Sequence, residues 1–253
     1  MNGLAQLLEE SNFPPYAYGL LQAATLAERL GLRSIRAFEL GVATGNGLLE
    51  LERLATVIGG PSGVRVDVFG IDTGDGMPAP MDHRDMPYIW QRGFFRMDRV
   101  ELEARLQHAT LVLGDVADTG GELLEITSPV GFLAFDLDYY SSTAAAMRVL
   151  LDAPPDRYLP RVFCYFDDTV GPHEEYHSRF TGELRAIDEF NRAHQSRKLA
   201  QIHGLRYKLL PLEAPWVEGM YVLHLFDHPR YGDYVFPVAD RQFPLEKQHR
   251  SPS

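Results

Sequence analysis

The chain has 253 residues, of which 45% are hydrophobic and 23% charged, a composition typical of a globular protein with a sizeable core. Its formal net charge of −11 argues against a nucleic-acid partner, because phosphate groups are bound through lysine and arginine. No apolar run approaches the roughly 18 residues that a membrane-spanning helix needs, so we expect no membrane segment and no membrane partner.

Two features of the chain lead us to expect a cytoplasmic protein. Its first residues, MNGLAQLLEESNFPPYAYG, contain early glutamates and no basic segment, so they do not read as a signal peptide. The single cysteine, Cys164, excludes a disulfide framework and fits a reducing compartment.

In chain order, a helical segment within residues 1–34 precedes alternating strand and helix patterns. Apolar runs predict strands over 36–42, 64–72, 110–115, 130–138 and 161–168, and helical patterns occupy 47–59, 101–109, 143–152 and 182–195. The segment GGPSG over 59–63 is expected to end the first of these helices. Residues 206–212 and 219–227 are expected to close the series as a hairpin.

This alternation predicts an α/β fold in a single domain over 1–253: a doubly wound, mainly parallel, seven-stranded sheet with a C-terminal antiparallel strand pair. The irregular segment 73–98, called the insertion below, is too long for an ordinary connection. We expect it to be a lid or substrate loop, or else a disordered insertion. The tail over 227–253 is expected to shape a pocket or an oligomer contact, and a homo-oligomer is left open.

The turn after the first strand is rich in small residues. In an open α/β sheet, ligands bind at the carboxyl ends of the strands, so this turn is a candidate binding segment. The sequence ELGVATGNG places Gly41, Ala43 and Gly45 at alternate positions after Glu39, where a ligand can approach the backbone and the amides of the next helix. The spacing is not that of a dinucleotide-binding fingerprint.

Acidic residues end the next two strands. Asp72 ends the second strand, where a carboxylate suits the two hydroxyls of a ribose, and Asp75 is a nearby competitor for that role. Asp115 follows the third strand, where it could accept a hydrogen bond from an adenine amino group. Each acid alone is also typical of a helix cap or a turn.

At this point the chain resembles the class I S-adenosylmethionine-dependent methyltransferases over roughly 35–226. ELGVATGNG is similar to their first motif, with Ala43 in place of the middle glycine. The resemblance implies S-adenosyl-L-methionine as cofactor, with Glu39 near its methionine amino group and Gly41 and Gly45 against it. It also implies that Asp72 contacts the ribose and that Asp115 lies near the adenine. The acceptor would be a small molecule.

Four further aspartates follow the fourth and fifth strands, which neighbour each other in such a sheet. Asp136 and Asp138 follow one strand and Asp167 and Asp168 the other, so their oxygens suit a hard cation such as Mg²⁺. The alternative is that some of them cap helices. FDLDYYSST and FDD resemble the metal sites of magnesium-dependent O-methyltransferases of the catechol and macrocin types. The resemblance implies that Asp136 or Asp138 binds the metal ion together with Asp167 and Asp168. It also implies that Asp136 lies beside the cofactor.

The general base is not marked by the expected residue type. Those families place a lysine or histidine three residues after the first metal acid, and this chain has Tyr139 or Ser141 there. Tyr139 and His173, just past the metal pair, are therefore the candidate catalytic residues.

A second metal pattern competes with the aspartates. His173-Glu174-x-x-His177 matches the zinc-protease pattern, which requires both histidines on one face of a helix. The motif lies after Gly171-Pro172, and the next helical pattern begins beyond it. We therefore favour the aspartates, and these three residues could instead line the acceptor site.

The leading hypothesis is a magnesium-assisted O-methyltransferase acting on a hydroxyl of a sugar or secondary metabolite. The alternatives are a non-catalytic nucleotide-binding protein of the same fold and a zinc hydrolase. Tyr88, Trp90, Phe94 and Trp216 could form apolar walls of the acceptor pocket, and the alternative for each is ordinary packing beneath a loop.

Overall fold

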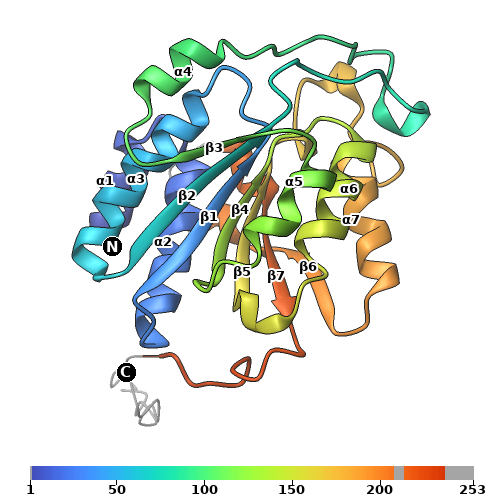
Figure 1. The fold of residues 1–253 in the computed structure, drawn as a ribbon. Helices are drawn as coiled ribbons and strands as arrows, with labels where there is room; N and C mark the ends of the chain where they lie inside the picture. The colour runs from blue at the N-terminus through green and yellow to red at the C-terminus, as the bar shows by residue number, and fades with distance from the viewer. Residues whose placement is uncertain (1, 208–213, 237–253) are drawn as a thin grey trace, which may run out of the picture.

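The computed structural model describes residues 2–207 and 214–236 and contains one seven-stranded sheet (Figure 1). The strands are β1 (Ser34–Leu40), β2 (Arg65–Asp72), β3 (Thr110–Leu113), β4 (Val130–Phe135), β5 (Tyr158–Phe166), β6 (Arg197–Gln201) and β7 (Met220–Leu225). Their order across the sheet is β3-β2-β1-β4-β5-β7-β6. The first five pair in parallel, and β7 is antiparallel to both β5 and β6. The predicted fold class is confirmed.

Helices cover both faces of this sheet. They are α1 (Asn2–Glu10), α2 (Pro14–Arg29), α3 (Asn46–Ser62), α4 (Arg99–Arg105), α5 (Val116–Leu123), α6 (Tyr140–Leu150) and α7 (Gly182–Ala193). In Figure 1, α1–α3 lie on one side of the sheet and α5–α7 on the other. Each face therefore buries its own apolar core, which is why the central strands read as continuous apolar runs.

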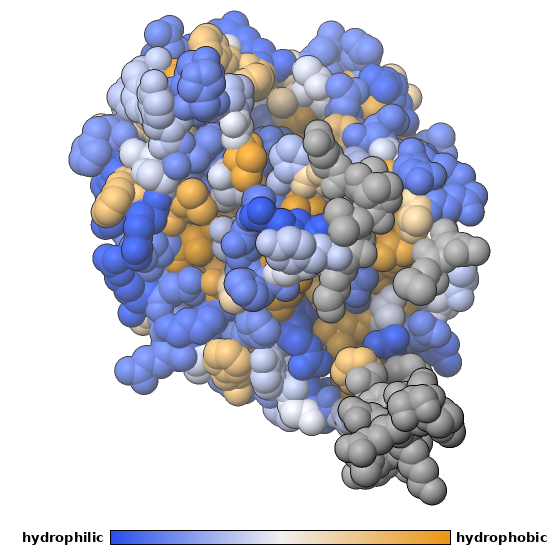
Figure 2. Space-filling view, turned by 180° about the vertical axis from the view of Figure 1, so that it is seen from behind, coloured by the Kyte–Doolittle hydropathy of each residue, from blue (hydrophilic) through white to orange (hydrophobic). Residues whose placement is uncertain are grey.

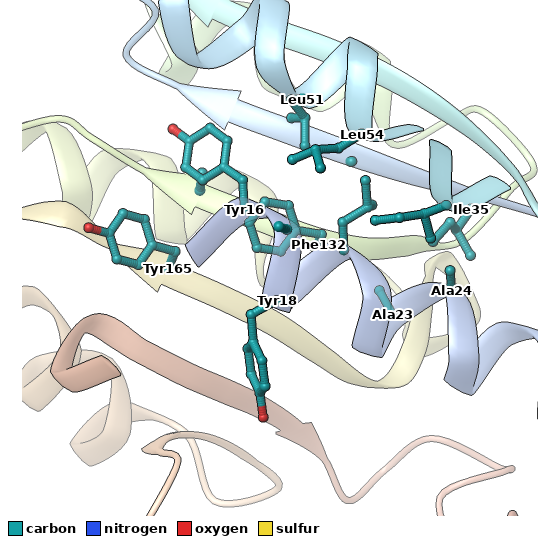
Figure 3. Close-up of a cluster of buried hydrophobic side chains, with 14 of the residues drawn as sticks. Tyr16, Tyr18, Ala23, Ala24, Ile35, Leu51, Leu54, Phe132 and Tyr165 are labelled. Atoms are coloured by element: carbon teal, nitrogen blue, oxygen red, sulfur yellow. The ribbon is translucent and has the colours of Figure 1, made fainter. Parts of the chain in front are cut away.

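The core on the α2 side is built around aromatic rings. Tyr16 of α2 packs edge-on against Phe132 of β4 and Tyr165 of β5, with centroid distances of 5.8 and 6.0 Å. Figure 3 shows Tyr16 and Tyr165 with both hydroxyl groups directed toward the same end of the sheet. On the opposite face, Phe135 and Phe166 end neighbouring strands and stack at 4.5 Å. The stacked rings of Phe135 and Phe166 hold the carboxyl ends of β4 and β5 together, directly before Asp136 and Asp167.

Two predicted boundaries were wrong. The helix predicted to end at residue 59 continues as α3 through Pro61 to Ser62, and it ends where Gly63 adopts a left-handed φ of 65°. The strand predicted over 206–212 does not pair with β7 where it is described: residues 206 and 207 belong to a short 3₁₀ turn, Leu205–Tyr207, and 208–213 lie outside the described residues. The antiparallel partner of β7 at the sheet edge is instead β6.

Polar side chains dominate the face of the molecule that is opposite to the view of Figure 1. Hydrophilic residues predominate there, and hydrophobic residues show in smaller groups between them (Figure 2). Within the described part of the chain, no helix has the length and apolar character to cross a membrane.

Candidate functional site

A cavity of about 370 Å³ opens at the carboxyl ends of the parallel strands. Eight of the predicted site residues line it: Gly41, Ala43, Asp72, Asp115, Asp136, Asp138, Asp167 and Asp168. The insertion supplies a further part of the wall through Thr73, Gly76, Met77, Pro78, Trp90 and Phe95. Because β1 and β4 are neighbours in the sheet while their helices lie on opposite faces, the cavity lies at the point where strand order reverses.

The glycine-rich turn forms the cavity floor by close backbone approach. Gly41 has a φ of 85°, and a Cβ there would lie 1.7 Å from the carbonyl oxygen of Asp136, so only glycine fits. Ala43 also has a positive φ, 46°, which is uncommon for a residue with a side chain. Gly45 does not line the cavity, because it packs against Leu102 and is the N-cap residue of α3. The turn therefore exposes Gly41 and Ala43 to the cavity.

Asp72 is fixed by three backbone amides at the end of β2. Its Oδ2 accepts hydrogen bonds from the amides of Val42 and Ala43 at 2.8 and 3.0 Å, and its Oδ1 accepts one from Gly74 at 2.6 Å. The carboxylate thus ties the glycine-rich turn to the start of the insertion. Asp75, its competitor for the ribose role, is exposed and does not line the cavity.

Asp115 has the capping role that the sequence left open. It is the N-cap of α5, and its Oδ1 accepts the amide of Ala117 at 2.8 Å. It also lines the cavity, so capping does not remove it from the site.

Glu39 lies behind the cavity wall and does not line it. Its side chain is buried, its Oε1 accepts a hydrogen bond from the Tyr16 hydroxyl at 2.8 Å, and its Oε2 has no hydrogen-bond partner. Burial raises the pKa of Glu39 to about 8, the Tyr16 hydrogen bond opposes this shift, and the charge of Asp72 adds to it. The structure therefore shows a buried carboxyl with one oxygen left to accept a donor.

The four aspartates after β4 and β5 meet at the cavity and repel one another. Burial, followed by the charges of neighbouring aspartates, raises the pKa of Asp136 and Asp168 well above the ordinary range and that of Asp138 to about 7. Asp138 adopts a left-handed φ of 57°, and its amide donates to Asp168 Oδ2 at 3.0 Å. The Tyr165 hydroxyl donates to Asp167 at 2.6 Å.

These oxygens have the chemistry of a hard-cation site, but they are not gathered as ligands. Across residues 2–207 and 214–236, no three histidine, cysteine, aspartate or glutamate side chains are placed to hold a metal ion. The predicted magnesium site stays a prediction.

Two acids that the sequence did not single out belong to the same region. Glu183, at the start of α7, is fully buried; its Oε2 accepts the amide of Asp168 at 3.1 Å, and its Oε1 has no partner. Asp85, in the insertion, is also fully buried and accepts hydrogen bonds from the amide and hydroxyl of Ser141 and from the amide of Met81. Asp85 thereby fastens the insertion to α6.

The two predicted catalytic residues lie outside the cavity wall. The His173 side chain is 87% exposed and pairs with Glu174 at 3.2 Å. Tyr139 is buried, and its hydroxyl donates to the carbonyl of Pro78 at 3.3 Å. Burial, with lesser effects from Asp85 and Asp138, raises the pKa of Tyr139 to about 12.

The zinc-protease pattern does not have the geometry it needs. His173–Glu175 form a single 3₁₀ turn, and Tyr176 interrupts it with a left-handed φ of 54°. The His173 side chain is exposed, whereas that of His177 is buried and pairs with Glu175 at 2.6 Å. The two histidines are therefore not presented on one helical face.

The predicted aromatic walls divide between two places. Trp90 lines the cavity beside Phe95, which the sequence reading missed, at a centroid distance of 5.9 Å. Tyr88 and Phe94 are exposed on the same insertion. Trp216 instead packs against Tyr18 in the core on the α2 side and does not line the cavity, so ordinary packing, the alternative to a wall role, holds for this residue. The insertion is an ordered part of the cavity wall.

Comparison with solved structures shows proteins of the same fold. The crystal structure of CalS11, described as a calicheamicin methyltransferase, has a TM-score of 0.54 and 19% identity, covering 88% of this chain and 90% of its own. The O-methyltransferase NovP has a TM-score of 0.51 and 16% identity, covering 71% and 72%. No protein-family model and no curated protein sequence matches the chain. The chain therefore has the fold of these methyltransferases.

Proposed function

We propose that the protein transfers a methyl group from S-adenosyl-L-methionine to a hydroxyl of a small molecule, such as a sugar or a secondary metabolite, with Mg²⁺ as the assisting ion. The observation that carries the proposal is the composition of the cavity wall. A close-packed glycine turn after β1 faces aspartates from the ends of β2, β3, β4 and β5. The fold shared with two methyltransferases supports it.

The cofactor site would use the turn and the first two strand-end acids. Gly41 and Ala43 leave room for a ligand against the backbone, and a cavity of about 370 Å³ is of the size that cofactors occupy. Asp72 would accept the ribose hydroxyls and Asp115 the adenine amino group. When bound, the cofactor would supply an activated methyl group, and the residues of the cavity wall would hold the cofactor beside the acceptor.

Asp136 or Asp138, with Asp167 and Asp168, would hold the magnesium ion. The donor chemistry fits, because buried carboxylates that repel one another gain most from a hard cation. When bound, the ion would lower the pKa of the acceptor hydroxyl and orient its oxygen. His173 and Tyr139 are the proposed bases, and each has to leave its present contact with Glu174 or Pro78 before it can reach an acceptor.

Calorimetric titration with S-adenosylmethionine and its demethylated product, S-adenosylhomocysteine, tests this proposal. We expect Asp72→Asn to weaken cofactor binding roughly 10- to 100-fold, because hydrogen bonds to a charged carboxylate are lost. Asp75→Asn is the matched control, since Asp75 is exposed in the same insertion and outside the cavity. Absence of binding by both nucleosides, with and without Mg²⁺, would refute the proposal.

Turnover separates this enzyme from a non-catalytic protein of the same fold. A screen of hydroxyl acceptors with radiolabelled methyl donor should show transfer that depends on Mg²⁺ and is lost in Asp168→Asn. Cofactor binding without transfer to any acceptor would favour the non-catalytic alternative.

A further inference from the structure

Tyr165, the penultimate residue of β5, donates a hydrogen bond to Asp167 from behind the cavity wall. Its hydroxyl lies 2.6 Å from Asp167 Oδ1, and Tyr165 itself does not line the cavity. Asp167 is an exposed residue of the cavity wall, and within the described part of the chain its carboxylate accepts no other hydrogen bond. The orientation of the Asp167 side chain therefore depends on one tyrosine hydroxyl.

The ring of Tyr165 is held on two sides by the core. Tyr16 of α2 packs against it edge-on at a centroid distance of 6.0 Å, and a Cβ at Gly219 would lie 2.9 Å from Cε2 of the ring. Figure 3 shows the Tyr165 hydroxyl directed away from the packed aliphatic side chains. Because the ring is buried between these neighbours, its hydroxyl is fixed at the carboxyl end of β5.

The neighbouring Asp168 is oriented by different contacts. Its Oδ2 accepts the amide of Asp138 at 3.0 Å, and its own amide donates to Glu183 Oε2 at 3.1 Å. Asp167 and Asp168 thus each give one oxygen to a protein donor. The other oxygen of each, Oδ2 of Asp167 and Oδ1 of Asp168, accepts no hydrogen bond from the described residues. Each carboxylate therefore keeps one oxygen for a hard cation.

Tyr16 offers a comparison within the same core. Its hydroxyl donates to Glu39 Oε1 at 2.8 Å, and Glu39 does not line the cavity. Both tyrosines are buried and both donate to a carboxyl group, but only the partner of Tyr165 reaches the cavity. A purely structural role would be shared by the two hydroxyl groups, whereas a role in the site would belong to Tyr165 alone.

From these contacts we infer that Tyr165 is a positioning residue for the proposed magnesium ion, because its hydroxyl holds Asp167 through Oδ1 and leaves Oδ2 to bind the cation. Donors behind a ligating carboxylate commonly fix its direction in metal sites. With Asp167 and Asp168 held, cation binding has only to draw in Asp136 or Asp138. The inference rests on the proposed function and adds the residue that orders one of its metal ligands.

Binding of Mn²⁺ tests the inference without an acceptor, since Mn²⁺ prefers the same oxygen ligands as Mg²⁺. Electron paramagnetic resonance measures the free Mn²⁺ that remains at each concentration, and the line shape of the bound ion reports its ligand geometry. Competition by Mg²⁺ identifies a shared site. We expect Tyr165→Phe to weaken Mn²⁺ binding roughly 10- to 100-fold and to change the bound line shape, because the loss of a donor behind a ligand typically has this effect.

Tyr16→Phe is the matched control, because it removes an equivalent buried hydroxyl from the same core. We expect its Mn²⁺ affinity to stay within about twofold of wild type. Urea denaturation of both variants establishes that each is folded and compares their loss of stability. Calorimetry with S-adenosylhomocysteine in the absence of metal should give the same affinity for Tyr165→Phe and for wild type.

The outcomes separate this inference from the proposed function. Unchanged Mn²⁺ affinity in Tyr165→Phe, or equal weakening in both tyrosine variants, would overturn the inference. If the wild type binds S-adenosylhomocysteine but no Mn²⁺, the inference is overturned and the cofactor part of the proposed function stands. If Mn²⁺ shows the expected pattern while S-adenosylhomocysteine does not bind, methyl transfer is refuted and the role of Tyr165 at a metal site is supported.

Discussion

The buried carboxyl of Glu39 should make the folded protein less stable as pH rises. Its pKa is about 8 in the folded chain, against an ordinary value of 4.5, and burial is the main cause. Between these values the folded state keeps a proton that the unfolded chain releases, so stability is present below pH 4.5 and declines as pH rises to 8. Each pH unit in that window costs about 1.4 kcal/mol.

Glu39→Gln tests this directly. The glutamine keeps the size of the side chain and an oxygen to accept the Tyr16 hydroxyl, but it has no proton to lose. At pH 7 the wild-type penalty reaches up to about 3 kcal/mol, because pH 7 lies about 2.5 units above the unfolded pKa. The variant should therefore be more stable by a similar amount at pH 7 and equal to wild type at pH 4. Urea denaturation at both pH values measures the difference.

Glu50→Gln is a control of opposite sign. Glu50 is also buried, but it accepts hydrogen bonds from Arg53 and Ser11, and these bonds, opposed by burial, leave its pKa lowered. Its substitution should destabilise the protein at pH 7 and have less effect as pH falls. The reasoning is refuted if Glu39→Gln is less stable than wild type at pH 7, or if its gain is the same at both pH values.

Three further changes test other parts of the structure. Arg36→Met should lower the free energy of unfolding by roughly 3 kcal/mol in urea titration, since the buried guanidinium donates to three backbone carbonyls that the methionine would leave unpaired. Asp85→Asn should speed proteolytic cleavage within 73–98 by about tenfold, because it loses acceptors for Ser141 and Met81, whereas a rate equal to wild type would show that the insertion is held elsewhere. Under the proposed function, adding Mg²⁺ should raise the melting temperature of the wild type and not that of Asp168→Asn, and an equal rise in both would remove Asp168 from the metal site.

The strand-end aspartates could be predicted because parallel strands converge at their carboxyl ends. Once the apolar runs that lead to Asp72, Asp115 and Asp136 are assigned to parallel strands of one sheet, their meeting at one cavity follows from topology. Gly41 could also be singled out from the sequence, because it lies in the turn after the first strand that is rich in small residues. The structure supplies the reason for a glycine there, since the backbone of Asp136 passes too close for a side chain.

Other features depend on contacts between distant parts of the sequence. The edge strand β6 has the sequence RKLAQ, and its Arg197 is buried through an ion pair with Asp227, so no apolar alternation marks it. Asp85 and Glu183 lie in a loop and at a helix start, where acids are ordinarily exposed. Only the fold brings them against Ser141 and Asp168 and buries them.

Capping and ligand binding are compatible roles for the same carboxylate. A carboxylate has about four acceptor positions, and Asp72 uses three on backbone amides while Asp115 uses one on Ala117. Both still line the cavity, so under the proposed function the backbone bonds would hold each side chain in place for the cofactor and reduce the ordering cost of binding. The substitution Asp115→Asn can keep the cap through its side-chain oxygen. A loss of cofactor affinity without a loss of stability in that variant would therefore identify the free oxygen as the ligand contact.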